Sequence, residues 1–200
     1  MTRITDLDAL QALYGDPVPA SLTKVRNRLT PAYRRWIGQS RLVMLSTVGP
    51  EGTDCSPRGD DGPVVRVVDD RTLWLPDWRG NNRIDSLRNI VRDGRISLLF
   101  LVPGSNNVVR VNGTAHVTTD PAITGSFTQR DSHPRSVIVV EAAELYFQCA
   151  KALMRAGTWR AGDETEGLPS AGDFLREADP DFDAADYDAT YAERAKPRMW

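Results

Sequence analysis

Apolar residues in the first forty positions recur at helical spacing. Residues 5–13 are predicted to form one helix, because a capping residue precedes the apolar run and a Gly and a Pro follow it. Residues 31–39 are predicted to form another, because Thr30 is a favourable cap and Pro31 is a favourable first helical residue. We therefore expect residues 1–40 to be an N-terminal helical segment.

From Arg41 onward the spacing changes to short β-type runs, with Gly, Pro, Asn and Asp between them. One long helix is expected over residues 82–92, and shorter helices are expected to begin at Pro121 and to cover residues 150–156. The predicted strands cover residues 42–48, 53–58, 64–68, 72–75, 96–102, 108–119 and 136–147.

Strands that follow one another this closely favour an antiparallel meander over βαβ units. The predicted fold is mainly β with flanking helices, in which six or seven antiparallel strands close into a small barrel, since closure removes exposed sheet edges. Two hundred residues with 40% hydrophobic content suit one domain covering residues 1–200. Residues 161–200 form an acidic C-terminal extension, either helical near Phe174 and over residues 183–195 or partly mobile.

Charge and composition argue against several classes of partner. The net charge of −2 supplies no general attraction to nucleic acid or to an anionic membrane. No apolar run approaches the roughly 20 residues of a membrane-spanning helix, and the N-terminus lacks the apolar centre of a signal peptide. We therefore expect a cytoplasmic protein with no nucleic-acid or membrane partner.

The few cysteines and histidines argue against a metal centre and against hydrolytic catalysis. Cys55 and Cys149 lie far apart in the sequence and outside any Cys-x-x-Cys spacing. His116 alternates within a predicted strand, and His133 precedes a proline in a polar loop. We predict free thiols, no metal site and no Ser-His-Asp triad.

The segment from Leu73 to Arg83 has the features of a phosphate-binding corner. A strand ends at Pro76, the chain turns through a glycine, and Asn81 or Asn82 then stands where a helix needs a cap, which places Arg83 in the first turn. Backbone N–H groups at a helix N-terminus and a nearby guanidinium both favour an oxyanion. The alternative is an ordinary capped helix with a solvated arginine.

Several sequence blocks in unbroken order carry a family resemblance. From about Leu42 to about Trp159, the chain resembles the pyridoxamine 5′-phosphate oxidase-related flavoproteins, which have an FMN-binding split-barrel fold. The blocks are Ser56-Pro-Arg-Gly-Asp60, Thr72-Leu-Trp-Leu-Pro-Asp77, Gly80-Asn-Asn-Arg-Ile-Asp-Ser-Leu-Arg-Asn-Ile90, Leu98-Leu-Phe-Leu-Val-Pro-Gly104 and Val109-Arg-Val-Asn-Gly113.

The resemblance implies a homodimer with FMN at the subunit interface. Arg58 matches the family's arginine on the strand after the first turn, and Asn82-Arg83 matches a pair that is basic in the family, so one cation is replaced here by a neutral donor. Two further candidates come from residue chemistry: Arg155, whose guanidinium can reach a phosphate, and Trp159, whose indole can cover a ring or simply pack in the core. The expected cofactor-binding residues are Ser56, Arg58, Leu75, Pro76, Asn82, Arg83, Arg155 and Trp159.

The expected function is an FMN-dependent oxidoreductase acting on a small molecule, with no side-chain acid or base assigned. Pyridoxamine phosphate itself is disfavoured, because the chain ends after an acidic stretch and Gly59-Asp-Asp-Gly62 interrupts the strand that should carry a substrate-binding lysine. The alternatives are a non-catalytic flavin-binding or storage protein, a barrel whose cofactor site has decayed, and a split barrel that uses a deazaflavin or haem.

Overall fold

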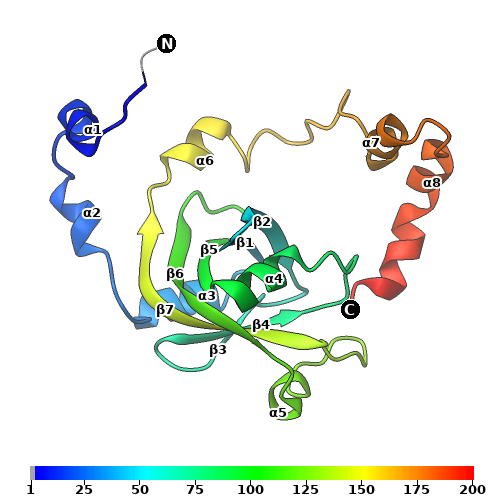
Figure 1. Cartoon of the computed structure of the whole chain (residues 1–200), viewed down its shortest axis with the longest axis horizontal. Coiled ribbons are helices and arrows are strands. Elements are labelled where there is room, and N and C mark those ends of the chain that lie inside the picture. Colours follow the sequence, from blue (N-terminus) through cyan, green and yellow to red (C-terminus); the bar gives the residue numbers. More distant parts are fainter. Residues whose placement is uncertain (1–2) are drawn as a thin grey trace.

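Seven antiparallel strands form one sheet in this protein, whose structure is a computed structural model describing residues 3–200 (Figure 1). The spatial order is β2-β1-β5-β6-β7-β4-β3, and every neighbouring pair is antiparallel. The predicted mainly-β, seven-stranded antiparallel fold is thereby confirmed. The strands are β1 (Leu42–Gly49), β2 (Gly52–Gly59), β3 (Arg66–Val67), β4 (Thr72–Asp77), β5 (Arg95–Leu101), β6 (Val108–Thr118) and β7 (Ser136–Gln148).

The core lies on the inner face of this curved sheet. Alternate residues of the strands are buried, as in β1, where Val43 and Leu45 are inaccessible and their neighbours are partly exposed. Ile37 and Ile90 from two flanking helices complete the same hydrophobic cluster. Burial of every second side chain along a strand is expected for a sheet with one face covered by the core.

The third strand is shorter than predicted. Residues 64–68 were expected to form a strand, but only Arg66 and Val67 pair with β4. Val64 and Val65 are instead buried in the core, and the backbone N–H of Val64 donates to the carbonyl of Ser40 at 2.8 Å. Burial of the two valines therefore takes this segment away from the sheet ladder.

The longest strands, β6 and β7, bend at an irregularity between Asn112 and Gly113. A β-bulge increases local twist and allows one strand pair to serve both halves of a curved sheet. Gly113 is required there, since a Cβ atom on it would lie 1.9 Å from the carbonyl oxygen of Glu141.

Helices flank the sheet on several sides (Figure 1). Two near the N-terminus begin as predicted, with the side chains of Asp6 and Thr30 accepting hydrogen bonds from the first turns. No helix among residues 3–200 is long and apolar enough to cross a bilayer. The helices are α1 (Leu7–Tyr14), α2 (Pro19–Thr23), α3 (Pro31–Ile37), α4 (Asp85–Arg92), α5 (Pro121–Thr124), α6 (Lys151–Ala156), α7 (Ala171–Ala178), α8 (Ala184–Ala195) and the 3₁₀ helix η1 (Lys196–Arg198).

The C-terminal extension is helical and returns to the barrel. Ser170 and Asp173 form a reciprocal capping box at the start of α7, and Asp183 caps α8. After η1 the chain ends beside α4 and β4 (Figure 1), where the Trp200 indole donates to Asp60 at 3.0 Å. The C-terminal end of the chain thus meets the loop after β2 on this side of the barrel.

Candidate functional site

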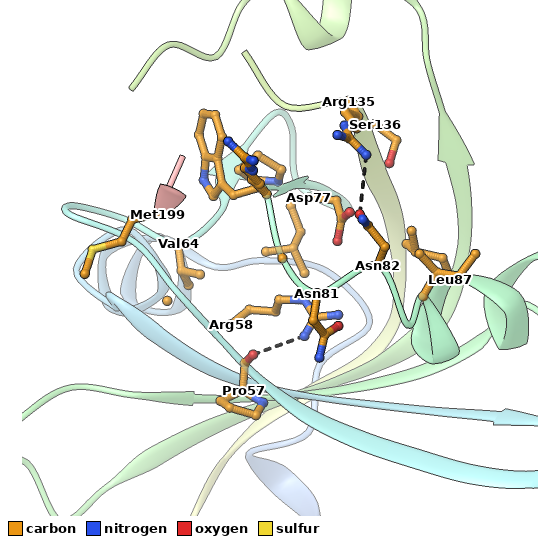
Figure 2. Close-up of a pocket in the computed structure, with 17 residues that line it drawn as sticks. Pro57, Arg58, Val64, Asp77, Asn81, Asn82, Leu87, Arg135, Ser136 and Met199 are labelled. Carbon is orange, nitrogen blue, oxygen red and sulfur yellow. Dashed lines mark hydrogen bonds between the residues drawn. The ribbon is translucent and has the colours of Figure 1, made fainter. Parts of the chain in front are cut away.

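A cavity of about 400 Å³ lies where β2 and β4 end, between the loop that precedes α4 and the start of β7 (Figure 2). Its size suits a small-molecule site. Polar side chains occupy part of the lining, and the apolar remainder comes from the strand ends, α4 and the C-terminus. The principal lining residues are Arg58, Asp77, Asn81, Asn82, Arg135 and Ser136 on the polar side, and Val64, Leu75, Pro76, Ile84, Leu87 and Met199 on the apolar side.

Half of the predicted cofactor-binding residues meet in this cavity. Arg58, Leu75, Pro76 and Asn82 all line it, although they come from two strands and one loop. Ser56 lies directly behind, where its hydroxyl accepts a 2.7 Å hydrogen bond from Nη1 of Arg58. β2 and β4 stand near opposite ends of the strand order, so curvature of the sheet, and not direct pairing, brings their ends to one cavity.

Arg58 is held in place by neutral groups. Its Nη1 also donates to the carbonyl of Pro57 at 3.1 Å, and its Nη2 donates to the hydroxyl of Ser86 at 3.3 Å. Ser86 is buried in the first turn of α4 and donates to Asp54 at 2.5 Å. Among residues 3–200 no carboxylate lies within 4.0 Å of the guanidinium of Arg58, so its charge is available to an anion.

Helix α4 begins later than the sequence suggested, and this is a correction. The helix was expected to be capped by Asn81 or Asn82 with Arg83 in its first turn, but it begins at Asp85 and its N-cap residue, Ile84, makes no side-chain cap. The side chain of Asn81 instead accepts from the backbone N–H of Arg83 at 3.1 Å. The asparagine thus closes a local turn rather than the helix.

Two residues of this loop have left-handed backbone conformations. Asn82 has φ 62° and Ile84 has φ 56°. Asparagine tolerates this region, whereas a β-branched residue adopts it only under strain. Strained backbone of this kind persists where the surrounding structure imposes it and is concentrated at ligand-binding loops. The backbone of this loop therefore makes it a candidate ligand-binding segment.

Arg83 points away from the cavity. Its Nε donates to Asp85 at 2.8 Å, the side chain is 77% exposed, and it lines a separate groove with Glu51 and Arg92. This ion pair raises the pKa of the Arg83 guanidinium. The structure therefore separates the predicted pair: Asn82 faces the cavity and Arg83 faces solvent.

Arg155 and Trp159 also lie outside the cavity. Arg155 is exposed on α6. The indole of Trp159 donates to the carbonyl of Ser105, in the turn between β5 and β6, at 2.7 Å. Within one chain, Trp159 thus anchors α6 to that turn.

Asp77 and Arg135 line the cavity but were not singled out from the sequence. Burial raises the pKa of Asp77, while the positive charges of Arg58 and Arg135 act in the opposite direction. Arg135 also donates to the side chain of Asn82 at 3.4 Å (Figure 2). Asp77 had a sequence signal, since it directly follows Pro76, but nothing near Arg135 in the sequence marks it as a site residue.

The arrangement fits a phosphorylated planar cofactor better than a metal ion. Residues 3–200 contain no cluster of three or more His, Cys, Asp or Glu side chains able to hold a metal. Arg58 offers positive charge without a carboxylate partner, Asn82 offers a side-chain amide, and Leu75 with Leu87 offers an apolar wall. A buried phosphate requires positive charge and hydrogen-bond donors, and a ring system requires an apolar wall.

A family model described as "Pyridoxamine 5′-phosphate oxidase" matches residues 29–149. No curated protein matches the chain. Among solved structures, a tagged histidine-to-alanine variant of HupZ from Group A Streptococcus is similar, with 21% identity, a TM-score of 0.50, and coverage of 60% of this chain and 98% of the other.

Two further solved structures are similar to parts of this chain. One is a putative pyridoxamine 5′-phosphate oxidase from Lactobacillus delbrueckii, with 23% identity, a TM-score of 0.48, and coverage of 60% of this chain and 95% of that one. The other is an FMN-binding protein from Syntrophomonas wolfei, with 15% identity, a TM-score of 0.44, and coverage of 58% and 83%.

Proposed function

We propose that this chain, which belongs to the pyridoxamine 5′-phosphate oxidase family, is an FMN-dependent oxidoreductase whose flavin occupies the cavity beside Arg58. The observation that carries the proposal is the guanidinium of Arg58, held by two serine hydroxyls, free of any carboxylate partner among residues 3–200, and facing a cavity. FMN, when bound, would supply the redox chemistry.

The phosphate of FMN would be held by Arg58, with Arg79, Arg135 and the amide of Asn82, which line the same cavity, as additional partners. A phosphate with nearly two negative charges is costly to desolvate unless cations and donors meet it, and these residues provide both kinds of group. Compared with the doubly basic pair of the resembled family, the cation at this loop is lost, since Asn82 is neutral and Arg83 faces away. The countercharge therefore comes from Arg58 on β2, together with Arg79 and Arg135 in the lining of the same cavity.

The ring system would lie against Leu75, Pro76 and Leu87. These side chains exclude water from one face of the cavity, which strengthens the electrostatic effect of any donor nearby. Reduced flavin develops negative charge near N1, and Arg58 or a backbone N–H of the strand end is suited to stabilise it. No side chain is assigned as a general acid or base.

We also propose that two copies of the chain associate around the flavin and that the protein acts in the cytoplasm. Large apolar side chains remain exposed outside the cavity, among them Phe147 on β7 and Met154 on α6, which are 46% and 52% accessible. Burial of such side chains against a second copy would contribute favourable free energy. This supports a homodimer, with a small molecule as the substrate.

The test that separates an oxidoreductase from a flavin store is anaerobic reduction of the FMN-loaded protein. We expect NADH or NADPH to bleach the flavin absorption band, and air to restore it. A protein that binds FMN but whose flavin band is unchanged by both NADH and NADPH would be a storage protein, and the oxidoreductase assignment would be wrong.

A further inference from the structure

The N-terminal helix α1 carries an apolar face that stays exposed. Leu7, Leu10 and Tyr14 follow one another at spacings of three and four residues, so they lie on one side of the helix. Leu7 and Tyr14 are 78% and 80% exposed, and no residue of α1 is buried. The helix stands clear of the barrel, at one side of the molecule (Figure 1). Its apolar side is therefore left for another surface.

The length of α1 makes such a surface necessary. The helix has eight residues, and isolated helices shorter than about 12–15 residues are marginal in water. Among residues 3–200, no hydrogen bond or ion pair joins residues 3–17 to the rest of the chain. Packing of an apolar face is what stabilises a short helix in a protein, so α1 requires a surface to pack on.

The linker after α1 keeps the helix away from its own barrel. Pro17 and Pro19 fix the backbone on either side of Val18, which is extended with φ −61° and ψ 137°. The side chain of Val18 is itself exposed. A linker stiffened by two prolines disfavours folding of α1 back onto the same chain. This favours a second copy of the chain as the partner surface.

A groove of about 510 Å³ lies where α3 meets the start of β6 and the end of β7. Its apolar lining comes from Ala32, Tyr33 and Trp36 on α3, Val109 on β6 and Phe147 on β7. The last two residues are paired across the strands. An apolar groove of this kind accommodates the apolar face of a helix, whose side chains three and four residues apart serve as anchors.

The rim of the groove is basic, whereas the N-terminal arm is acidic. Lys24 and Arg26 line the groove, no acidic residue does, and among residues 3–200 neither cation has a carboxylate within 4.0 Å. Residues 3–17 contain one arginine and three aspartates, which are Asp6, Asp8 and Asp16. Complementary charges at the edge of a contact select the partner and its orientation, while the apolar contact supplies the free energy.

We propose that α1 of one copy docks in the groove of a second copy, and that the exchange is reciprocal. Each copy contributes one helix and one groove, which is the arrangement of a two-fold symmetric dimer with exchanged arms. Leu7, Leu10 and Tyr14 cover the apolar lining of the groove, and Asp8 faces its basic rim. The inference rests on the homodimer in the proposed function and names the surfaces that hold the two copies together.

Disulfide trapping in the full-length chain tests the exchange. In a background with Cys55→Ser and Cys149→Ser, Leu10→Cys is combined with Ala32→Cys, an exposed position of the groove lining. After mild oxidation we expect a reducible species of twice the chain mass, in which peptide mapping finds residue 10 bonded to residue 32. Phe174→Cys with Ala32→Cys is the matched control, because Phe174 is an exposed apolar residue on the other arm of the chain, and it should stay reduced.

Sedimentation measures the strength of the contact. Leu10→Glu places a charge on the apolar face and is expected to raise the dimer Kd at least about tenfold. Leu168→Glu, at an exposed leucine outside α1 and the groove, is the control and should dimerise as wild type. Asp8→Lys and Lys24→Glu should each raise the Kd roughly threefold, the effect of an exposed ion pair. The double variant should recover most of this loss, because the pair is reversed and not removed.

The outcomes separate this proposal from the proposed function. A wild-type dimer that gives no bond at residue 10, gives a bond within one chain, or keeps its Kd in Leu10→Glu would overturn the arm exchange and leave the homodimer standing. A bond at residue 174 alone would show that the other arm fills the groove. A wild-type chain that sediments as a monomer contradicts both the homodimer and the exchange. FMN titration remains an independent test, since no residue lines both the groove and the cavity beside Arg58.

Discussion

The indole nitrogen of Trp200 lies 3.0 Å from the carboxylate of Asp60, so the last residue of the chain is tied to the loop that follows β2. The same carboxylate accepts from the indole of Trp78 at 2.7 Å and from the amide of Gln129 at 2.9 Å. The guanidinium of Arg130 lies 4.5 Å from the Trp200 ring. Asp60 thus joins four segments of the chain around the edge of the cavity.

Trp200→Ala is expected to loosen the C-terminal extension, because it removes both the hydrogen bond to Asp60 and the contact with Arg130. Hydrogen exchange of the α8 amides should become faster, while exchange in β5 and β6 stays unchanged. Trp159→Ala, which removes an indole hydrogen bond at the other side of the barrel, is the control. Unaltered exchange in α8 would mean that Trp200 does not hold the extension.

Arg58 and Arg83 are expected to differ sharply in their effect on FMN affinity. Arg58→Gln should weaken binding by about 1.5–3 kcal/mol, the range for a hydrogen bond to a charged group. Arg83→Gln should have a small effect, since its side chain is exposed and paired with Asp85. FMN dissociation constants of the two variants decide this. Equal losses, or a larger loss for Arg83→Gln, would mean that Arg83 turns toward the phosphate.

Ile84 offers a test of the strained loop. At an ordinary helix position glycine is about 1 kcal/mol less stable than alanine. At φ 56° the order should reverse, because alanine retains a left-handed strain of about 1–2 kcal/mol that glycine lacks. Ile84→Gly should therefore have a higher free energy of unfolding than Ile84→Ala in urea titrations. The opposite order would show that residue 84 is not left-handed in solution.

Asp77 is expected to make stability depend on pH in the FMN-free protein. Burial raises the pKa of Asp77 in the folded state, so the folded chain binds a proton at this carboxylate more tightly than the unfolded chain does. Protonation of Asp77 stabilises the folded state fully at pH values below the aspartate pKa of the unfolded chain, which is near 4. This stabilisation is lost as the pH rises through the raised pKa of the folded state. Asp77→Asn should thus raise Tm at pH 7 but have little effect in strong acid.

The pH comparison needs an exposed aspartate as control. Asp163 lies at the start of the C-terminal extension, outside the cavity, and hydrogen bonds from Thr165 lower rather than raise its pKa. Asp163→Asn should therefore lower Tm slightly at pH 7, or leave it unchanged. A Tm of Asp77→Asn that falls at pH 7 would indicate that Arg58 and Arg135 stabilise the carboxylate more than burial destabilises it.

Gly113→Ala tests the β-bulge at the bend of β6. Its Cβ would lie 1.9 Å from a backbone oxygen of Glu141, so one of the two longest strands must shift. Overpacking against backbone costs about 3 kcal/mol. Gly59→Ala is the control, since its added Cβ would lie 3.6 Å from the nearest atom and its φ is not positive. Similar unfolding midpoints for both variants would contradict the geometry.

The strands and part of the site could be predicted from sequence, because both depend on local patterns. Alternating apolar residues identified β1 and its hairpin with β2, and contiguous sequence blocks placed Arg58, Leu75 and Pro76 at one cavity. Residue preferences at helix caps did not predict where α4 begins. An asparagine is a favoured helix cap and a β-branched residue is a poor one, yet Ile84 occupies the cap position in a left-handed conformation.

The remaining site residues depend on long-range folding. Arg135 reaches the cavity because β7 pairs with β4, and Met199 reaches it because α8 and η1 return the C-terminus to the barrel. No periodicity near either residue signals such a placement. Arg194 and Arg198 lie in a segment of the sequence that is rich in acidic residues, so their clustering is not evident from the sequence. It becomes evident in the structure, where both line one cavity.

The most direct test of the account is a titration of the purified wild-type chain, stripped of any bound cofactor, with FMN, followed by quenching of the flavin fluorescence. We expect saturable binding of one FMN per chain, in the micromolar range or tighter, corresponding to about 8 kcal/mol or more. Binding should be clearly weaker for riboflavin, which lacks the phosphate that Arg58 would hold. Absence of saturable quenching by FMN, or equal affinity for riboflavin, would contradict the central claim.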